Sequence, residues 1–168
     1  MELYFIKCKI DDFDEFFMLR RDDENILWTG HKKIPDKNKL KDWFYKQLNR
    51  EDRIIFLAKS SETKETVGYL YIDIVEEKNN IIEISHGIHS KFKGNGLGTK
   101  NVKYAIDYVK LNLVFIDQLD AWIASNNIGS VKTFLKNGFS KTNEIKMIFF
   151  EGFNEKIEMQ KFVYEIQR

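Results

Sequence analysis

The sequence predicts an α+β (α/β) fold, with a mixed, largely antiparallel sheet of about seven strands and about four flanking helices. Two observations lead to this class. The 168 residues are 43% hydrophobic and 14% aromatic, which suffices for one packed core but not for two comfortable domains. Segments with strand and helix periodicity also follow one another without a repeat, a low-complexity tract or a linker. We therefore expect residues 1–168 to form one domain.

The first third of the chain predicts a strand, two helices and a long loop. Residues 2–10 are rich in aromatic and branched side chains, which is typical of a strand. Apolar residues then recur at helical spacing in two segments, which begin near Phe13 and Leu40. Residues 22–37 are polar and include the single proline of the chain, so we expect a loop there. Loops of this length often bind ligands.

The remainder of the chain predicts about six strands and two helices. Polar links at residues 60–65 and 76–80 join the first three of these strands, and short links favour an antiparallel meander. The predicted strands are Arg53 to Lys59, Val67 to Val75, Ile81 to His89 and Gln118 to Ala124, with two more flanking a turn at residues 151–154. One predicted helix includes residues 102–109. The other spans residues 129–136 and is closed by Gly138.

Charge and cysteine content exclude several classes of partner. Twenty-seven Lys and Arg residues against 26 Asp and Glu residues give a net charge of +1, so no overall field attracts nucleic acid or an anionic membrane. The single cysteine, Cys8, cannot form an internal disulfide. No apolar stretch approaches the roughly 20 residues that cross a bilayer, and the N-terminus does not read as a secretion signal. We therefore expect a soluble, cytoplasmic protein.

A glycine-rich segment lies between a predicted strand and a predicted helix. Residues 93–99 read Lys-Gly-Asn-Gly-Leu-Gly-Thr. Glycines let the backbone turn tightly and approach a ligand, and the free amides and dipole at a helix start favour an anion such as a nucleotide phosphate. Lys93 and Lys100 add positive charge. A plain strand-to-helix turn would have the same spacing, so both interpretations stay open.

Two familiar phosphate-binding motifs do not fit this segment. A Walker A loop requires Gly-Lys-Ser/Thr after four intervening residues, which is absent here. A dinucleotide-binding loop follows the first strand of a parallel sheet, whereas this one follows three strands that we expect to be antiparallel. Both interpretations are disfavoured.

Two segments resemble motifs of the GNAT acetyltransferase family. Residues 93–98 resemble Gln/Arg-x-x-Gly-x-Gly/Ala, with Lys93 in the first position, and residues 127–139 resemble Asn-x-x-Ser/Ala-x-x-x-Tyr-x-Lys-x-Gly-Phe. The resemblance extends from Thr66 to the C-terminus and is strongest to ribosomal-protein-alanine, polyamine and amino-sugar acetyltransferases. It implies a GNAT-like fold and acetyl-coenzyme A (acetyl-CoA) as co-substrate, without a metal ion.

The resemblance also implies which residues contact the cofactor. In the family, backbone amides of the glycine turn bind the pyrophosphate, and a backbone amide at the position of Ile88 bonds the thioester carbonyl. A tyrosine that often protonates the leaving thiolate is replaced here by Phe134, which would equally suit a helix core. The implied cofactor residues are Ile88, Lys93, Gly94, Asn95, Gly96, Leu97, Gly98, Thr99, Asn127, Phe134 and Lys136.

Acetyl transfer requires a neutral amine to attack the thioester carbon and lose a proton, so a general base is expected. Glu83 matches a carboxylate often found on this strand in the subgroup, although an exposed or ion-paired glutamate would look the same. His86 has a suitable unperturbed pKa near 6.5, with substrate contact or packing as its alternatives. Both are predicted as catalytic residues.

Phe134 cannot supply the proton that the family tyrosine supplies. A thiolate whose conjugate acid has a pKa near 8.5 is a fair leaving group, so it would leave unaided or take a proton from water or another tyrosine. The replacement of the family tyrosine by Phe134 also leaves open a second interpretation, a catalytically silent domain that binds acetyl-CoA and regulates a partner.

The acceptor is predicted to be a primary amine of a small molecule. Residues 19–23, followed by Trp28, are similar to the start of amino-sugar acetyltransferases, where Arg20 would hold a phosphate and Trp28 would pack on a sugar or base. The same sequence is also expected if residues 19–23 form a solvated helix end and Trp28 packs in the core. A nucleotide-linked amino sugar is therefore favoured, a polyamine or a protein N-terminus stays an alternative, and a homodimer is left open.

Overall fold

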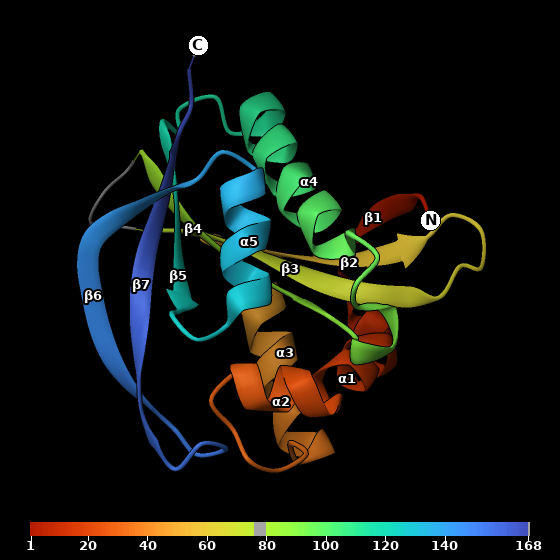
Figure 1. Ribbon diagram of the computed structural model, residues 1–168. Helices are drawn as coiled ribbons and strands as arrows, with labels where there is room; N and C mark the ends of the chain where they lie inside the picture. Colours follow the sequence, from red (N-terminus) through yellow and green to blue (C-terminus); the bar gives the residue numbers. More distant parts are fainter. Residues whose placement is uncertain (76–79, 168) are drawn as a thin grey trace.

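The computed structural model describes residues 1–75 and 80–167. Seven strands form one sheet in the order β1-β2-β3-β4-β5-β7-β6 (Figure 1). Neighbouring strands are antiparallel except for β4 and β5, which are parallel. The strands are β1 (Leu3–Lys7), β2 (Arg53–Ser60), β3 (Thr66–Ile74), β4 (Ile81–Ile88), β5 (Gln118–Ala124), β6 (Ser140–Phe150) and β7 (Glu155–Glu165). The predicted mixed, largely antiparallel sheet is confirmed.

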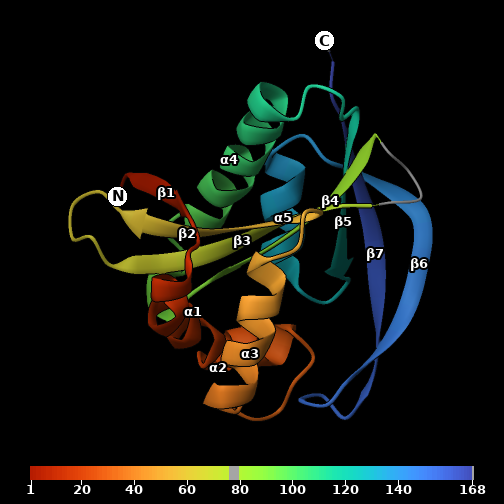
Figure 2. The same cartoon turned by 180° about the vertical axis from the view of Figure 1, so that it is seen from behind.

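Helices cover both faces of this sheet. Figure 1 shows α4 and α5 in front of it, and Figure 2 shows α1 and α3 on the opposite side. The helices are α1 (Phe13–Arg20), α2 (Asp23–Trp28), α3 (Lys37–Leu48), α4 (Leu97–Asn112) and α5 (Ile128–Lys136), with short 3-10 turns at Ile10–Asp12 and Ser90–Phe92. No helix in the described part of the chain is long and apolar enough to cross a bilayer.

The stretch at residues 22–37, predicted to be a loop, begins with α2, and this part of the prediction is wrong. The buried Asp22 carboxylate caps the helix by accepting a hydrogen bond from the Asn25 amide at 3.2 Å. A six-residue helix is too short to show a 3.6-residue period, so sequence periodicity does not reveal it. The predicted link at residues 76–80 lies mostly outside the described residues.

The side chains of β3 alternate between two hydrophobic cores. Leu70 and Ile72 pack with α4 and α5, whereas Tyr69 and Tyr71 pack with α1 and α3. This is the two-residue period of a strand that is buried on both faces. The aromatic pair therefore lies on the sheet face opposite to α4.

The parallel strands β4 and β5 remain paired over a short distance only. Their register joins Ile81–Glu83 to Gln118–Asp120, after which the two strands diverge (Figure 1). β5 continues to pair with β7 over its whole length. The sheet thus stays continuous while a gap opens beside the C-terminal half of β4.

Gly68 provides a test of this packing, because β3 and β4 approach closely there. A Cβ on Gly68 would lie 2.6 Å from the Gly87 carbonyl oxygen and 2.6 Å from Ile88 Cδ1. We expect Gly68→Ala to lower the free energy of unfolding by about 1 to 3 kcal/mol. Gly129→Ala is the control, since its Cβ would come no closer than 3.9 Å to Asn127 Oδ1. Urea denaturation should separate the two variants, and equal stabilities would contradict this packing.

Candidate active site

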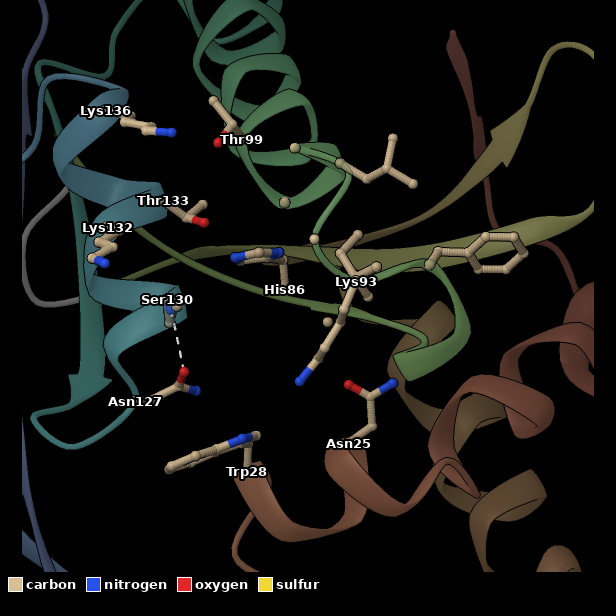
Figure 3. Close-up of a pocket in the computed structure, with 18 residues that line it drawn as sticks. Asn25, Trp28, His86, Lys93, Thr99, Asn127, Ser130, Lys132, Thr133 and Lys136 are labelled. Atoms are coloured by element: carbon tan, nitrogen blue, oxygen red, sulfur yellow. Dashed lines mark hydrogen bonds between the residues drawn. The ribbon is translucent and has the colours of Figure 1, made fainter. Parts of the chain in front are cut away.

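A cavity of about 370 Å³ lies between the start of α4, the length of α5, the end of β4 and α2 (Figure 3). Most residues predicted to contact the cofactor line it. They are Ile88, Lys93, Gly94, Gly96, Leu97, Gly98, Thr99, Asn127 and Lys136. Residues of the two motifs, 93–98 and 127–139, therefore meet at one cavity although they are far apart in the sequence.

The glycine turn shapes the opening of α4 onto this cavity. Gly94 and Gly96 have φ angles of 78° and 70°, in the left-handed region that glycine adopts without strain, and Gly96 is the N-cap of α4. Asn95 does not line the cavity; its Nδ2 donates to the carbonyls of Phe92 and Lys93, both at 3.2 Å, and so holds the turn. The first amides of α4 have no partner within the helix, which makes this end suitable for an anion.

The positive charge of the cavity comes from Lys93 and Lys136, which were predicted to contact the cofactor, and from Lys132, which was not predicted. Lys93 points into the cavity (Figure 3). It forms an ion pair with Glu24, and burial lowers the pKa of Lys93. Lys100, which was expected to contribute, instead donates to Glu2 Oε1 at 2.7 Å, away from the cavity. Lys132 and Lys136 of α5 supply charge in its place. Their four-residue spacing, which puts both on one helix face, was the available signal.

A second cavity of about 160 Å³ occupies the gap between β4 and β5. It shares Asn25, Trp28, His86, Asn127 and Ser130 with the larger cavity, so the two adjoin. Its other walls include Tyr69 and Tyr71 of β3, Ser85 of β4, Trp122 of β5 and Phe134 of α5. The two tyrosines and Trp122 were not predicted as site residues, because periodicity treats such side chains as core. Asn25 was missed because it lies in the stretch predicted to be a loop.

Phe134 separates the smaller cavity from the hydrophobic core. Its ring is 2% exposed and its centroid lies 5.6 Å from that of His86 and 4.9 Å from that of Phe139. The ring therefore belongs to the core on one side and to the cavity wall on the other. Phe134 is therefore both a core residue of its helix and a residue of the cavity wall.

The backbone of β4 presents amides to the gap. The His89 amide donates to the Val67 carbonyl at 2.9 Å, so the odd-numbered residues of this strand bond β3. Because successive residues of a strand point their hydrogen-bonding groups to opposite edges, the amides of His86 and Ile88 point toward β5. The pairing with β5 ends at Glu83. The Ile88 amide thus lies at an open edge, as the predicted role in bonding a thioester requires.

His86 is held as a neutral imidazole. Burial lowers the pKa of His86 to about 4. Asn101 Nδ2 donates to the Tyr69 carbonyl at 3.0 Å and lies 3.5 Å from His86 Nδ1. An amide nitrogen on that side favours the tautomer in which Nδ1 accepts and Nε2 carries the hydrogen. The ring can therefore donate a hydrogen bond on its other side.

Glu83 lies on the opposite face of β4 from His86, because the two are three residues apart on a strand. It lines neither cavity, although Ser85, on the same face, lines the smaller one. Burial raises the pKa of Glu83; the Lys146 ammonium opposes this rise, and the Asp73 and Asp120 carboxylates add to it. A raised pKa makes the carboxylate a stronger base at neutral pH. The two predicted catalytic residues do not contact each other.

Of the two predicted acceptor residues, Trp28 lines the two cavities and Arg20 lies behind the wall of the smaller one. Trp28 lines both cavities, with its ring centroid 5.4 Å from that of Phe153 in the β6–β7 turn. Arg20 lines neither, but its Nη1 donates to Tyr71 Oη at 3.2 Å, behind the wall of the smaller cavity. No group of three or more His, Cys, Asp or Glu side chains arranged to hold a metal ion occurs among residues 1–75 and 80–167.

The glycine turn, the divergent strands and the two cavities can be compared with known proteins. Residues 2–140 match the family described as "Acetyltransferase (GNAT) domain". The chain therefore belongs to the GNAT family, and it is an N-acetyltransferase that uses acetyl-CoA. This favours an enzyme over a silent binding domain. No curated protein sequence matches the chain.

Solved structures share the fold at low sequence identity. A spermidine N-acetyltransferase from Vibrio cholerae, in complex with CoA and spermine, superposes with a TM-score of 0.84 at 14% identity, covering 97% of this chain and 95% of that one. A ribosomal-protein-alanine N-acetyltransferase from Brucella melitensis gives 0.79 at 17%, covering 97% and 99%. An aminoglycoside acetyltransferase in complex with coenzyme A gives 0.79 at 14%, covering 98% and 95%. At these identities the likeness shows the fold and not the acceptor.

The low pKa of His86 predicts a pH-dependent stability. The unfolded chain has a His pKa near 6.5 and the folded one about 4, so between these pH values the unfolded state binds more protons. We expect the free energy of unfolding to fall as the pH drops from about 6.5 to 4, with His86 contributing at most about 3 kcal/mol. Denaturation of wild type and His86→Gln across this range should give curves that converge toward low pH. Parallel curves would show that His86 is not held neutral.

Proposed function

We propose that the larger cavity binds acetyl-CoA and that a primary amine of a small molecule enters the smaller cavity and attacks the thioester directly. The observation that carries this proposal is the divergence of β4 and β5. It leaves the Ile88 amide at an open edge that lines the larger cavity, two residues along β4 from His86, which lines both cavities. A carbonyl at this point would find a donor as its oxygen becomes negative.

The cofactor would lie across three elements. Its pyrophosphate would bind the amides at the start of α4, where Gly94 and Gly96 leave room for it, with Lys132 and Lys136 nearby. Its pantetheine arm would enter the gap past Asn127. The Ile88 amide would then stabilise the oxyanion, a contribution of about 3 to 4 kcal/mol for one well-placed donor.

The proton of the amine would pass to Glu83 through water that enters beside Ser85. The raised pKa of Glu83 suits this role, and its place outside both cavities requires the intervening water. His86 would donate a hydrogen bond from Nε2, because an imidazole with a pKa of about 4 is a weak base. Because Phe134 has no proton to give, the thiolate would leave unaided or be protonated by water.

The acceptor is proposed to be an amino sugar linked to a nucleotide. The wall formed by Trp28 and the charge of Arg20 behind Tyr71 support an acceptor with a planar ring and a negative group. Polyamines and protein N-termini are the alternative acceptors. A panel of nucleotide amino sugars, polyamines, aminoglycosides and short peptides, assayed for release of the free thiol of coenzyme A, tests the proposal. Saturable cofactor binding without thiol release from any amine would overturn it.

Gly96→Ala tests the placement of the pyrophosphate. A Cβ at this position meets no protein atom within 4 Å, so the substitution adds strain from the positive φ angle and places a methyl group in open space beside the turn. We expect the dissociation constant of coenzyme A to rise about tenfold or more, equivalent to about 1.4 kcal/mol. Isothermal titration calorimetry measures this.

Gly138→Ala is the matched control, since Gly138 has a φ of 85° but lies outside both cavities. It should lose a similar amount of stability and keep its affinity for coenzyme A. If the two variants bind the cofactor equally well, the turn does not hold the pyrophosphate.

Glu83→Gln tests the general base. Removing a base that acts through water should lower kcat by about 100-fold and leave the affinity for coenzyme A within about twofold. Glu144→Gln is the control, because Glu144 is an exposed strand glutamate whose oxygen lies 3.2 Å from Lys161. Steady-state kinetics with an accepted amine distinguish them. A wild-type rate and pH profile in Glu83→Gln would make Glu83 structural.

A further inference from the structure

A third cavity, of about 200 Å³, lies beside the acceptor end of the site and is positively charged. Arg20, His31 and Lys33 contribute polar side chains to it, and Ile26, Pro35 and Leu40 give it apolar walls. No acidic residue is among its described lining residues. Thr29 lines both this cavity and the smaller one between β4 and β5, so the two are neighbours.

No carboxylate among residues 1–75 and 80–167 forms an ion pair with the Arg20 guanidinium. Its guanidinium carbon lies 5.9 Å from the ring centroid of Phe16 and 6.0 Å from that of Trp43, which places it between aromatic side chains. Within the described residues it forms no ion pair, and its buried Nε has no hydrogen-bond partner. Its one side-chain partner, Tyr71 Oη, is neutral. Enclosed charges in proteins are normally paired, so this one is suited to an anionic ligand.

The nearest carboxylate in the sequence is engaged elsewhere. Asp22 accepts hydrogen bonds from the Asn25 amide and from the amide and hydroxyl of Ser90. By contrast, Arg53 is paired with Asp73 at 2.5 Å. Among the described residues, Arg20 therefore differs from Arg53 in having no paired carboxylate.

The loop that follows α2 brings a second cation to the same cavity. Lys33 is exposed, lines the cavity and has no ion pair in the described part of the chain. The loop is fixed in place, because the Glu151 amide of the β6–β7 turn donates to the Gly30 carbonyl at 3.0 Å. A flexible lysine beside a rigid, enclosed arginine is a suitable pair for an oxyanion.

We propose that this cavity binds the anionic group, a phosphate or a carboxylate, of the acceptor whose amine occupies the smaller cavity. The inference rests on the proposed function and deepens it, since it limits the acceptors to amines that also carry a negative charge. The acceptor would run past Thr29, with its anion between the Arg20 guanidinium and Lys33. Dicationic polyamines would then be poor substrates.

Binding of the anion can be measured without turnover. With the protein saturated with coenzyme A, inorganic phosphate and acetate are titrated separately while the Arg20 Nε–H signal is followed by NMR, the signal being assigned by its loss in Arg20→Lys. We expect a saturable shift with at least one of the two anions, and the tighter one identifies the group. Lys33→Gln should weaken this binding about tenfold, as expected for loss of one charge-assisted contact.

Lys32→Gln is the matched control, because the neighbouring Lys32 is equally exposed but does not line this cavity. Because Lys33 and Lys32 are both on the surface, these variants test the proposal even if Arg20→Lys does not fold. An Arg20 signal that does not respond, or equal effects of Lys33→Gln and Lys32→Gln, would overturn the anion site.

Turnover separates this inference from the proposed function. Glucosamine is compared with glucosamine 6-phosphate, and butylamine with 4-aminobutyrate, by thiol release. We expect kcat/KM to favour one of the anionic amines by about tenfold and Lys33→Gln to remove the preference. Turnover without any such preference would refute the anion site and leave the acetyltransferase proposal intact. Phosphate or acetate binding at Arg20 without turnover of any amine would support the anion site and refute the proposed acetyl transfer.

Discussion

The divergence of β4 from β5 is the constraint on which the rest of this site depends. The two parallel strands pair over three residues each and then separate, while β5 stays bonded to β7. Backbone amides in a protein interior are normally hydrogen-bonded, so an open strand edge inside a sheet is stable when a ligand or water bonds it. The gap is therefore a site for a ligand that runs along the strand, which is what an extended pantetheine arm would do.

The same divergence fixes the position of the two helices that line the larger cavity. α4 follows β4 and α5 follows β5, so both helices begin at the C-terminal ends of two parallel strands that move apart. Their N-caps, Gly96 and Asn127, both line the cavity. Ligands of open α/β sheets commonly bind at such a crevice, because the helix N-termini there present free amides and a positive dipole end.

The smaller cavity, where we propose that the amine binds, is assembled from parts that are distant in sequence. Asp22 joins α2 to the turn after β4 through its bonds to Ser90, and the tip of the β6–β7 hairpin packs on the loop after α2, where Gly152 approaches Leu27 and the His31 carbonyl. These contacts hold Trp28 against both cavities. Both cavities therefore depend on the N-terminal helix α2, and the larger one also depends on the central and C-terminal elements β4, α4 and α5.

The strand and helix pattern from Arg53 onward was predictable, because long amphipathic segments and the glycine turn leave a clear period in the sequence. The opposite orientations of Glu83 and His86 also follow from the two-residue period of a strand. The short helix α2 was missed, because six residues are too few for a period to appear and its cap, Asp22, derives much of its effect from tertiary contacts.

The charges of the site could not be assigned from sequence alone. Lys93 and Lys100 both flank the glycine turn, yet one points into the cavity and the other bonds Glu2, because their directions are set by which acid packs nearby. Arg20 likewise has the sequence context of an ordinary helix end, and only packing buries its Nε without a hydrogen-bond partner among the described residues. Local order along the chain determined the sheet, the helices around it and the glycine turn at the start of α4. Tertiary packing decided which of the charged side chains remain unneutralised and face a cavity, since that depends on neighbours brought together from distant parts of the chain.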